Sequence, residues 1–203
     1  GKLKSLKKIS ETEIETAKKI YFDFLDGQTV NKDAKIYIDK LPLNIVHIGE
    51  ISRIFPNSKF ILSVRHPLDC VLSCFMQDFE LNDAMANFLN LKDTAKLYDS
   101  VMKLWFQYIS IFKINYHQVK YENLVNNFQN TVKLVFKFLG LPWDDLVLNY
   151  SATAKKRDKI STPSYNQVIK PLYSHAEGRW KNYEAQMSTV YPVLNQWIAK
   201  FDY

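Results

Sequence analysis

The first strong pattern in the chain is an amphipathic helix close to its N-terminus. Residues 10–13 (Ser-Glu-Thr-Glu) have the spacing of a capping box, in which a Ser and a Glu three residues later bond each other's backbone N–H groups. Apolar residues then recur at helical spacing: Ile14, Ala17, Ile20, Tyr21, Phe24 and Leu25. The pattern predicts a helix that ends at residues 26–28 (Asp-Gly-Gln).

Three short runs have the character of β-strands. The clearest is Lys59 to Val64, which is nearly continuous in apolar residues and fits a parallel strand covered on both faces. His66 and Pro67 end it, and a helix follows. Weaker runs lie at Lys35 to Ile38 and at Gln118 to Lys120.

Helical periodicity fills most of the remaining chain. Helices are predicted from Pro42 to about Ile54, over about residues 92–112 and 128–139, and over about residues 191–199. Residues 152–171 are polar, include two Pro and have little periodicity, so they are interpreted as a long loop. Strands that alternate with helices predict one α/β domain over residues 1–203, with a parallel sheet flanked by helices.

Composition narrows the class of protein. The 203 residues carry a net charge of +6, which fits either a solvated basic surface or an anionic ligand. Lys and Arg form no groove-sized run with interleaved aromatics, so nucleic acid is not expected as a partner. Cys70 and Cys74 have no partner Cys or His pair at metal-ligand spacing, and we interpret them as buried free thiols.

The sequence contains no apolar run of membrane-spanning length and no signal peptide, which predicts a cytoplasmic protein without membrane attachment. Because Gly1 is followed by Lys2 without an initiator Met, we expect a fragment, in which any targeting segment could have been removed. Only five Gly are present, so there are few places where backbone can wrap a phosphate.

The main chemical signal is Arg65, at the end of the best predicted strand. Ligands of open α/β sheets bind beyond the carboxyl ends of the strands. A helix begins directly after Arg65, and helix N-termini favour anions. Ser73, about two turns into that helix, offers a hydroxyl, and the planar guanidinium matches a phosphate. The alternative is a structural ion pair, which is the more common role of an Arg at a strand end.

Five segments follow one another in order: residues 39–44 (DKLPLN), 55–67 (FPNSKFILSVRHP), 119–125 (VKYENLV), 138–143 (FLGLPW), and 164–171 (SYNQVIKP) followed by Arg179-Trp180. Together they resemble one family, the sulfotransferases that use 3'-phosphoadenosine 5'-phosphosulfate. The branch most similar is the tyrosylprotein sulfotransferases and their bacterial relatives. The resemblance implies a fold like that of P-loop NTPases and a reaction without a metal.

The resemblance also implies roles for individual residues. Lys40 and Ser164 would act in catalysis, at the transferring sulfonate. The residues that would bind the nucleotide are Arg65 and Ser73, at its 3'-phosphate, and Tyr121, Gln167, Lys170 and Arg179. Structural interpretations also exist: Lys40 as a solvated lysine, Tyr121 as a core aromatic, and Arg179 as a surface residue stacked on Trp180. The four histidines are interpreted as structural or surface residues.

The sequence departs from the family pattern in three places. No Gly-Ser/Thr-rich loop for the 5'-phosphosulfate precedes Asp39, and the first strand that would carry it is not recognised. No general base is identifiable, and Gln77 stands where the tyrosylprotein branch has a second basic residue. We therefore expect an N-terminally truncated sulfotransferase domain that is inactive by itself.

Alternatives remain open at this stage. The remnant fold could serve as a non-catalytic module that binds nucleotide or protein. A relationship to P-loop kinases is disfavoured because no Walker-type Gly-Lys-Ser/Thr is present. The acceptor hydroxyl, whether of a peptide tyrosine, a carbohydrate or a small molecule, is not evident from the sequence. Residues 82–94 and 152–162 are candidate acceptor loops, and a homo-oligomer is possible.

Overall fold

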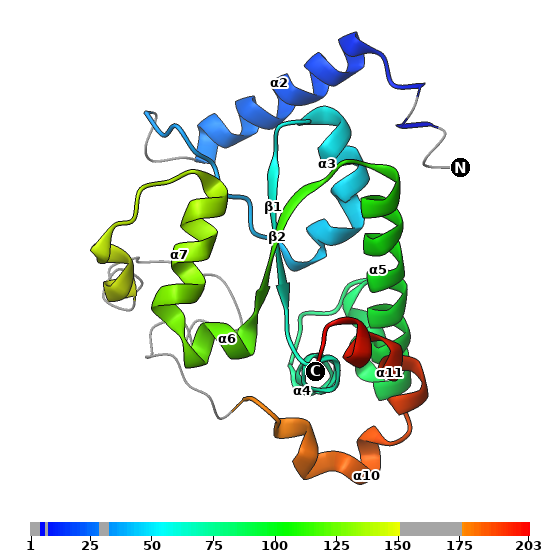
Figure 1. Ribbon diagram of the computed structural model, residues 1–203. Helices are drawn as coiled ribbons and strands as arrows, with labels where there is room; N and C mark the ends of the chain where they lie inside the picture. Colours follow the sequence, from blue (N-terminus) through cyan, green and yellow to red (C-terminus); the bar gives the residue numbers. More distant parts are fainter. Residues whose placement is uncertain (1–4, 7, 29–32, 151–175) are drawn as a thin grey trace. The chain divides into compact units, whose positions relative to one another are not determined.

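The computed structural model describes residues 5–6, 8–28, 33–150 and 176–203 (Figure 1). They form two compact units: residues 1–60 with 101–115, and residues 61–100 with 116–203. The predicted site residues Ser164, Gln167 and Lys170 lie outside the described residues. In the described part, no helix combines the length and the apolar character needed to cross a membrane.

The first unit begins with helix α2 (Glu11–Gln28), whose start confirms the predicted capping box. Glu13 Oε2 accepts the Ser10 N–H at 2.8 Å, and the Glu13 N–H donates to Ser10 Oγ at 3.3 Å. The Ser10 hydroxyl also donates to Glu13 Oε2, at 2.7 Å, and the two bonds from the Ser10 backbone and hydroxyl to this carboxylate lower the pKa of Glu13. A 3-10 helix η1 (Pro42–His47) leads into α3 (Ile48–Ile54), so the helix predicted from Pro42 forms in two parts.

The core of the first unit gathers around Tyr108, in the later part of helix α5 (Leu91–Ile111). The Tyr108 ring is 1% exposed, and its hydroxyl donates to the Val46 carbonyl at 3.2 Å. The ring lies so close to Gly49 that a Cβ built there would meet Cε1 at 2.7 Å. Residue 49 is therefore Gly because a larger side chain would displace this ring.

Most residues of a two-stranded sheet, formed by β1 (Lys59–Val64) and β2 (Asn115–Lys120), belong to the second unit. The strands run side by side in the same direction, which confirms the predicted parallel pairing (Figure 1). Leu62 and Val64 are buried whereas Ile61 is 42% exposed, so the described residues cover β1 on one face. Our prediction of a strand covered on both faces was wrong, because an apolar run does not reveal how many layers pack against it.

Helices connect and follow the strands. Helix α4 (Pro67–Met76) and α5 lie between β1 and β2 in the chain, and α6 (Tyr121–Asn126) and α7 (Phe128–Leu139) follow β2. Helix α11 (Tyr191–Lys200) packs on α4. The shorter elements are η2 (Met85–Leu89), η3 (Asp145–Asn149), η4 (Arg179–Tyr183) and α10 (Glu184–Met187). Leu68, Val71, Leu194 and Trp197 are all at most 5% exposed and form much of this unit's core.

The predicted strand at Lys35 to Ile38 does not form. Lys35 lies in a bend, residues 36–38 pair with no strand among the described residues, and Ile38 is 78% exposed. An isolated strand gains no ladder hydrogen bonds, so its β-character alone does not make it part of a sheet.

Candidate functional site

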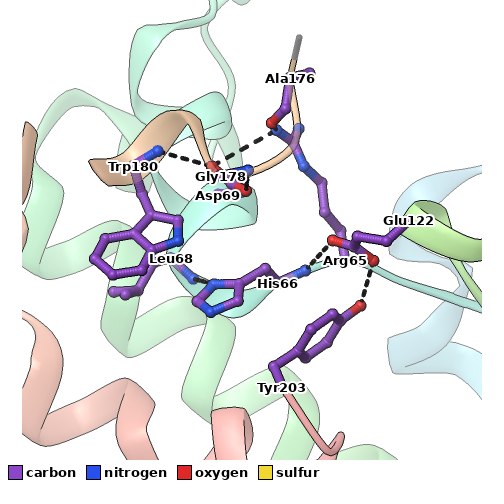
Figure 2. Close-up of polar contacts among 9 residues, drawn as sticks. All are labelled: Arg65, His66, Leu68, Asp69, Glu122, Ala176, Gly178, Trp180 and Tyr203. Atoms are coloured by element: carbon purple, nitrogen blue, oxygen red, sulfur yellow. Dashed lines mark hydrogen bonds and ion pairs between the residues drawn. The ribbon is translucent and has the colours of Figure 1, made fainter. Parts of the chain in front are cut away.

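Arg65 follows directly on β1 and lies within a cluster of polar contacts (Figure 2). Its guanidinium Nη2 donates to the Ala176 carbonyl and lies 3.9 Å from Asp69 Oδ1. The guanidinium also lies over the Tyr121 ring, 5.2 Å from the ring centre. Its Nε is buried and has no hydrogen-bond partner in the described part of the chain. A buried donor without a partner is costly, and an oxygen of an anionic ligand would satisfy it.

The carboxylate of Asp69 holds residues 176–180 against the start of α4. Asp69 is fully buried; its Oδ2 accepts the Gly178 N–H at 2.7 Å, and its Oδ1 accepts the Trp180 N–H at 2.9 Å. Gly178 adopts φ +69°, a left-handed conformation that favours Gly. The Glu177 carboxylate accepts a bond from the Asn126 amide at 3.1 Å. Residues 176–180 are thus tied to the end of β1, to α4 and to α6.

The N-terminus of α4 is already occupied by groups of the protein. Pro67 has no N–H, and the Leu68 N–H donates to His66 Nδ1 at 3.3 Å. The Asp69 carboxylate lies in the first turn, where negative charge compensates the helix dipole. The sequence predicted that this helix end would bind an incoming anion. In the structure, the Asp69 carboxylate and the His66 ring already occupy most of it.

A second carboxylate, that of Glu122, joins the end of β1 to the C-terminal residues. Glu122 Oε1 accepts the His66 backbone N–H at 2.9 Å. Glu122 Oε2 accepts the Tyr203 hydroxyl at 2.6 Å. Burial, together with this bond, raises the pKa of Tyr203 well above its usual value. Figure 2 shows the His66 backbone N–H and the Tyr203 hydroxyl both bonded to the Glu122 carboxylate, beside Arg65.

His66 is a structural residue, as the sequence analysis expected. Its ring stacks on that of Trp180, with 5.3 Å between the ring centres, and its centre lies 5.1 Å from that of the Tyr203 ring. Burial lowers the pKa of His66, which favours the neutral ring, and a neutral ring is also what Nδ1 needs to accept the Leu68 N–H. Trp180 therefore pairs with His66, and the proposed stacking of Arg179 on Trp180 is replaced by this contact.

Four predicted site residues fall in this unit. Arg65 and Tyr121 are brought into direct contact. Ser73 lies on α4, four residues after Asp69 and therefore on the same side of the helix, with its side chain exposed. Arg179 begins η4, is exposed, and lies between the two residues whose N–H groups bind Asp69.

Lys40 belongs to the first unit. Its side chain is exposed, and its neighbour Asp39 accepts bonds from Asn44 Nδ2 at 3.1 Å and from the Tyr21 hydroxyl at 3.5 Å. The Asp and Asn of the DKLPLN segment thus bond each other across the turn that carries Lys40.

Two carboxylates of this cluster, those of Asp69 and Glu122, were not predicted from the sequence. Glu122 lies inside the segment 119–125, directly after Tyr121, and Asp69 lies two residues after the segment 55–67. The available signal was an acidic residue four positions after Arg65 and another directly after Tyr121. Their partners lie far along the chain, so the pairing itself could not be predicted.

Cys70 and Cys74 are free thiols on α4, as we had expected, and both are half-buried. They hydrogen-bond each other, a bond that raises the pKa of Cys70 and lowers that of Cys74. Beyond α4, a hollow of about 250 Å³ is lined mainly by apolar side chains, with Phe79 and Phe88 in ring contact at 5.1 Å. Its lining residues are Phe75, Gln77, Asp78, Phe79, Leu81, Met85, Phe88 and Leu89.

Comparison with known proteins gives a family match. A model described as "Sulfotransferase family" matches residues 7–145. That range contains Lys40, Arg65, Ser73 and Tyr121 and ends before Arg179.

Individual relatives are considerably longer than this chain. Protein-tyrosine sulfotransferase 2 of Gallus gallus is 28% identical over 152 residues, which are 72% of this chain and 40% of that protein. Protein-tyrosine sulfotransferase A of Caenorhabditis elegans is 26% identical over 171 residues, 78% of this chain and 43% of that protein. An uncharacterized protein of Aquifex aeolicus is 26% identical over 166 residues, 81% of this chain and 21% of that protein. The chain therefore spans less than half the length of these relatives.

Proposed function

Because the chain belongs to the sulfotransferase family, we propose that it takes part in the transfer of a sulfonate group from 3'-phosphoadenosine 5'-phosphosulfate to a hydroxyl acceptor. In this reaction the bond from sulfur to the nucleotide's bridging oxygen breaks and a bond to the acceptor oxygen forms. The acceptor's proton goes to a general base, a role to which we assign no residue of this chain. We expect these 203 residues by themselves to bind nucleotide without transferring sulfonate, since no Gly-Ser/Thr-rich phosphate loop is recognisable in them.

The observation that carries the proposal is the set of contacts at Arg65. A guanidinium at a strand end, stacked on Tyr121 and with a buried Nε that lacks a partner in the described residues, is suited to a phosphate. We assign this position to the 3'-phosphate, with Ser73 as a hydroxyl donor. A phosphate oxygen would compete with the Ala176 carbonyl for Nη2.

Charge stabilisation is the catalytic contribution we propose for the remaining residues. Negative charge develops on the bridging oxygen as the nucleotide leaves, and a fixed cation or hydroxyl aimed at it lowers the barrier. Lys40 and Ser164 are the candidates for this role, and Gln167, Lys170 and Arg179 for contacts to the nucleotide. Loss of one such donor typically costs about 3 kcal/mol of transition-state stabilisation. The proposal requires no metal.

The hollow beyond α4 is our candidate for the acceptor. It follows the helix that carries Ser73, and three of its lining residues are Phe. Aromatic walls favour an aromatic group, and two relatives are named as protein-tyrosine sulfotransferases. We therefore propose a phenolic hydroxyl, such as that of a peptide tyrosine, as the acceptor.

Calorimetric binding of adenosine 3',5'-bisphosphate tests the nucleotide site. The unmodified chain is expected to bind, and Arg65→Ala to weaken binding roughly 100-fold, the effect of losing two charge-assisted hydrogen bonds of about 1.5 kcal/mol each. Arg53→Ala is a matched control, because Arg53 Nη2 bonds only the Ile9 carbonyl among the described hydrogen bonds.

Two results would argue against the proposal. Equal affinities of the unmodified chain and Arg65→Ala would remove Arg65 from the nucleotide site. A folded chain that binds no nucleotide would favour the alternative of a module that binds protein through the remnant fold. Circular dichroism of each variant shows whether a lost affinity reflects a lost fold.

A further inference from the structure

Glu122 and Tyr203 fix the backbone from which Arg65 departs. The peptide N–H of His66 follows Arg65 directly, and Glu122 Oε1 accepts it at 2.9 Å. The other oxygen of the same carboxylate accepts the Tyr203 hydroxyl at 2.6 Å. The carboxylate cannot turn away from His66 without breaking the bond to Tyr203. One side chain therefore holds the end of β1, and a distant residue holds that side chain.

Tyr203 is itself held from several sides. Lys120 Nζ lies over its ring at 4.6 Å and donates to the Asp202 carbonyl at 2.9 Å. The His66 ring lies 5.1 Å from the Tyr203 ring, and Phe201, two residues before it, is 2% exposed. Three contacts and a buried neighbour give the hydroxyl a defined position, so it can orient the carboxylate it binds.

We propose that Glu122 and Tyr203 are positioning residues that set the affinity of Arg65 for the nucleotide's 3'-phosphate. The proposal rests on the proposed function. It extends the phosphate site to the C-terminal residues of this chain, beyond the residues 7–145 that the family model matches. Neither side chain needs to touch the ligand.

The geometry supports this role because Glu122 affects the position of both the backbone and the guanidinium of Arg65. The bond to His66 fixes the backbone at the base of the Arg65 side chain. Tyr121, whose ring lies under the guanidinium, is the residue immediately before Glu122. A displacement of Glu122 would therefore move both the backbone that carries the Arg65 side chain and the Tyr121 ring against which its guanidinium lies. Misplacement of a binding group by about 1 Å is enough to lose much of its contribution.

Substitutions at Tyr203 and Glu122 in the full chain test the proposal. Tyr203→Phe removes the hydroxyl and keeps the ring, whereas Glu122→Ala removes both hydrogen bonds. Glu122→Gln keeps an acceptor for the His66 N–H and a group that can bond Tyr203. Tyr183→Phe is the control, since the Tyr183 hydroxyl has no hydrogen bond to the described residues and lies in the same unit.

The readout is the ratio of the affinities for adenosine 3',5'-bisphosphate and adenosine 5'-monophosphate, which lacks the 3'-phosphate. Tyr203→Phe is expected to weaken bisphosphate binding roughly threefold to tenfold, the effect of one hydrogen bond, with monophosphate binding unchanged. Glu122→Ala is expected to lower the ratio further, and Glu122→Gln and Tyr183→Phe to leave it near that of the unmodified chain.

A merely structural role would lower the melting temperature and leave the ratio unchanged, and that result would overturn the proposal. Should Tyr203→Phe unfold, the comparison of Glu122→Ala with Glu122→Gln still decides it: the ratio must fall in the variant that loses both bonds and persist in the variant that keeps them. An unmodified chain without preference for the bisphosphate would refute the proposed function and this inference together. A preference that both Tyr203→Phe and Glu122→Ala retain would refute this inference alone.

Discussion

Replacement of Asp69 should destabilise the second unit more than any exposed acidic residue would. The Asp69 carboxylate is fully buried and accepts the N–H groups of Gly178 and Trp180 at 2.7 and 2.9 Å. Asp69→Ala would leave both donors without their acceptor and would remove the anion 3.9 Å from Arg65. An unpaired buried charge and unmatched buried donors are among the few causes of a large loss of stability.

The magnitude follows from the number of bonds. Each hydrogen bond to a charged group contributes about 1.5 to 3 kcal/mol, and loss of one partner of a buried ion pair costs about 3 to 5 kcal/mol. We therefore expect Asp69→Ala to lower the free energy of unfolding by about 3 to 5 kcal/mol, or the melting temperature by about 6 to 20 °C for a chain of this size. Asp69→Asn keeps one acceptor oxygen and should lose about 2 kcal/mol.

Urea unfolding followed by tryptophan fluorescence measures these losses, because Trp180 lies in the affected segment. Asp78→Asn is the matched control, since Asp78 is exposed in the same unit. Amide hydrogen exchange gives a local reading: the Gly178 and Trp180 amides should be protected in the unmodified chain and lose protection in Asp69→Ala. The reasoning would be refuted if Asp69→Ala unfolded at the same urea concentration as Asp78→Asn.

Three further predictions concern stability and binding. Burial lowers the pKa of His66 below 6.5, so the unfolded chain binds more protons at this residue than the folded chain does. The free energy of unfolding should therefore fall as the pH drops from neutral to about 5, and it should fall less steeply in His66→Asn. Urea titrations at both pH values would measure the difference. Gly49→Ala should cost about 1 to 3 kcal/mol because its Cβ meets the Tyr108 ring, whereas Gly27→Ala, with nothing within 4 Å, should not destabilise the chain in thermal unfolding. Asp69 neutralises part of the charge on Arg65, so a second cation, Arg179, should supply part of the attraction for the nucleotide. Arg179→Ala should therefore weaken binding of adenosine 3',5'-bisphosphate in calorimetry and make that binding less dependent on salt.

Elements with strong local patterns were predicted almost to the residue. Helix α7 begins and ends where its periodicity and Gly140 place it, and Gly140 takes the left-handed conformation of a helix C-terminus. Helix α5, strand β1 and the capping box at Ser10 were predicted equally well. In each case, the residues that decide the structure lie within one or two turns of each other, so a single sequence carries enough information.

The failures share a different cause. Whether Lys35 to Ile38 forms a strand depends on a neighbouring strand, and the covering of β1 depends on which segments pack against it. The description of the chain as one domain likewise depends on long-range packing and stays a prediction beside the two compact units. Local patterns do not contain these facts, because hydrophobic residues look alike whatever they pack against.

The candidate site shows where a motif contains more than its ligand-facing residues. In the segment from Arg65 to Asp69, the basic residue was given a role and the acidic one was not, although the acidic one is the more deeply buried. The same holds for Tyr121 and Glu122. Glu122 binds the His66 N–H beside Arg65 and the distant Tyr203 hydroxyl, whereas Asp69 lies 3.9 Å from Arg65 itself and binds the distant N–H groups of Gly178 and Trp180. A motif of this kind therefore specifies both a phosphate-binding cation and the anions that place it, and the anions become interpretable only when their distant partners are known.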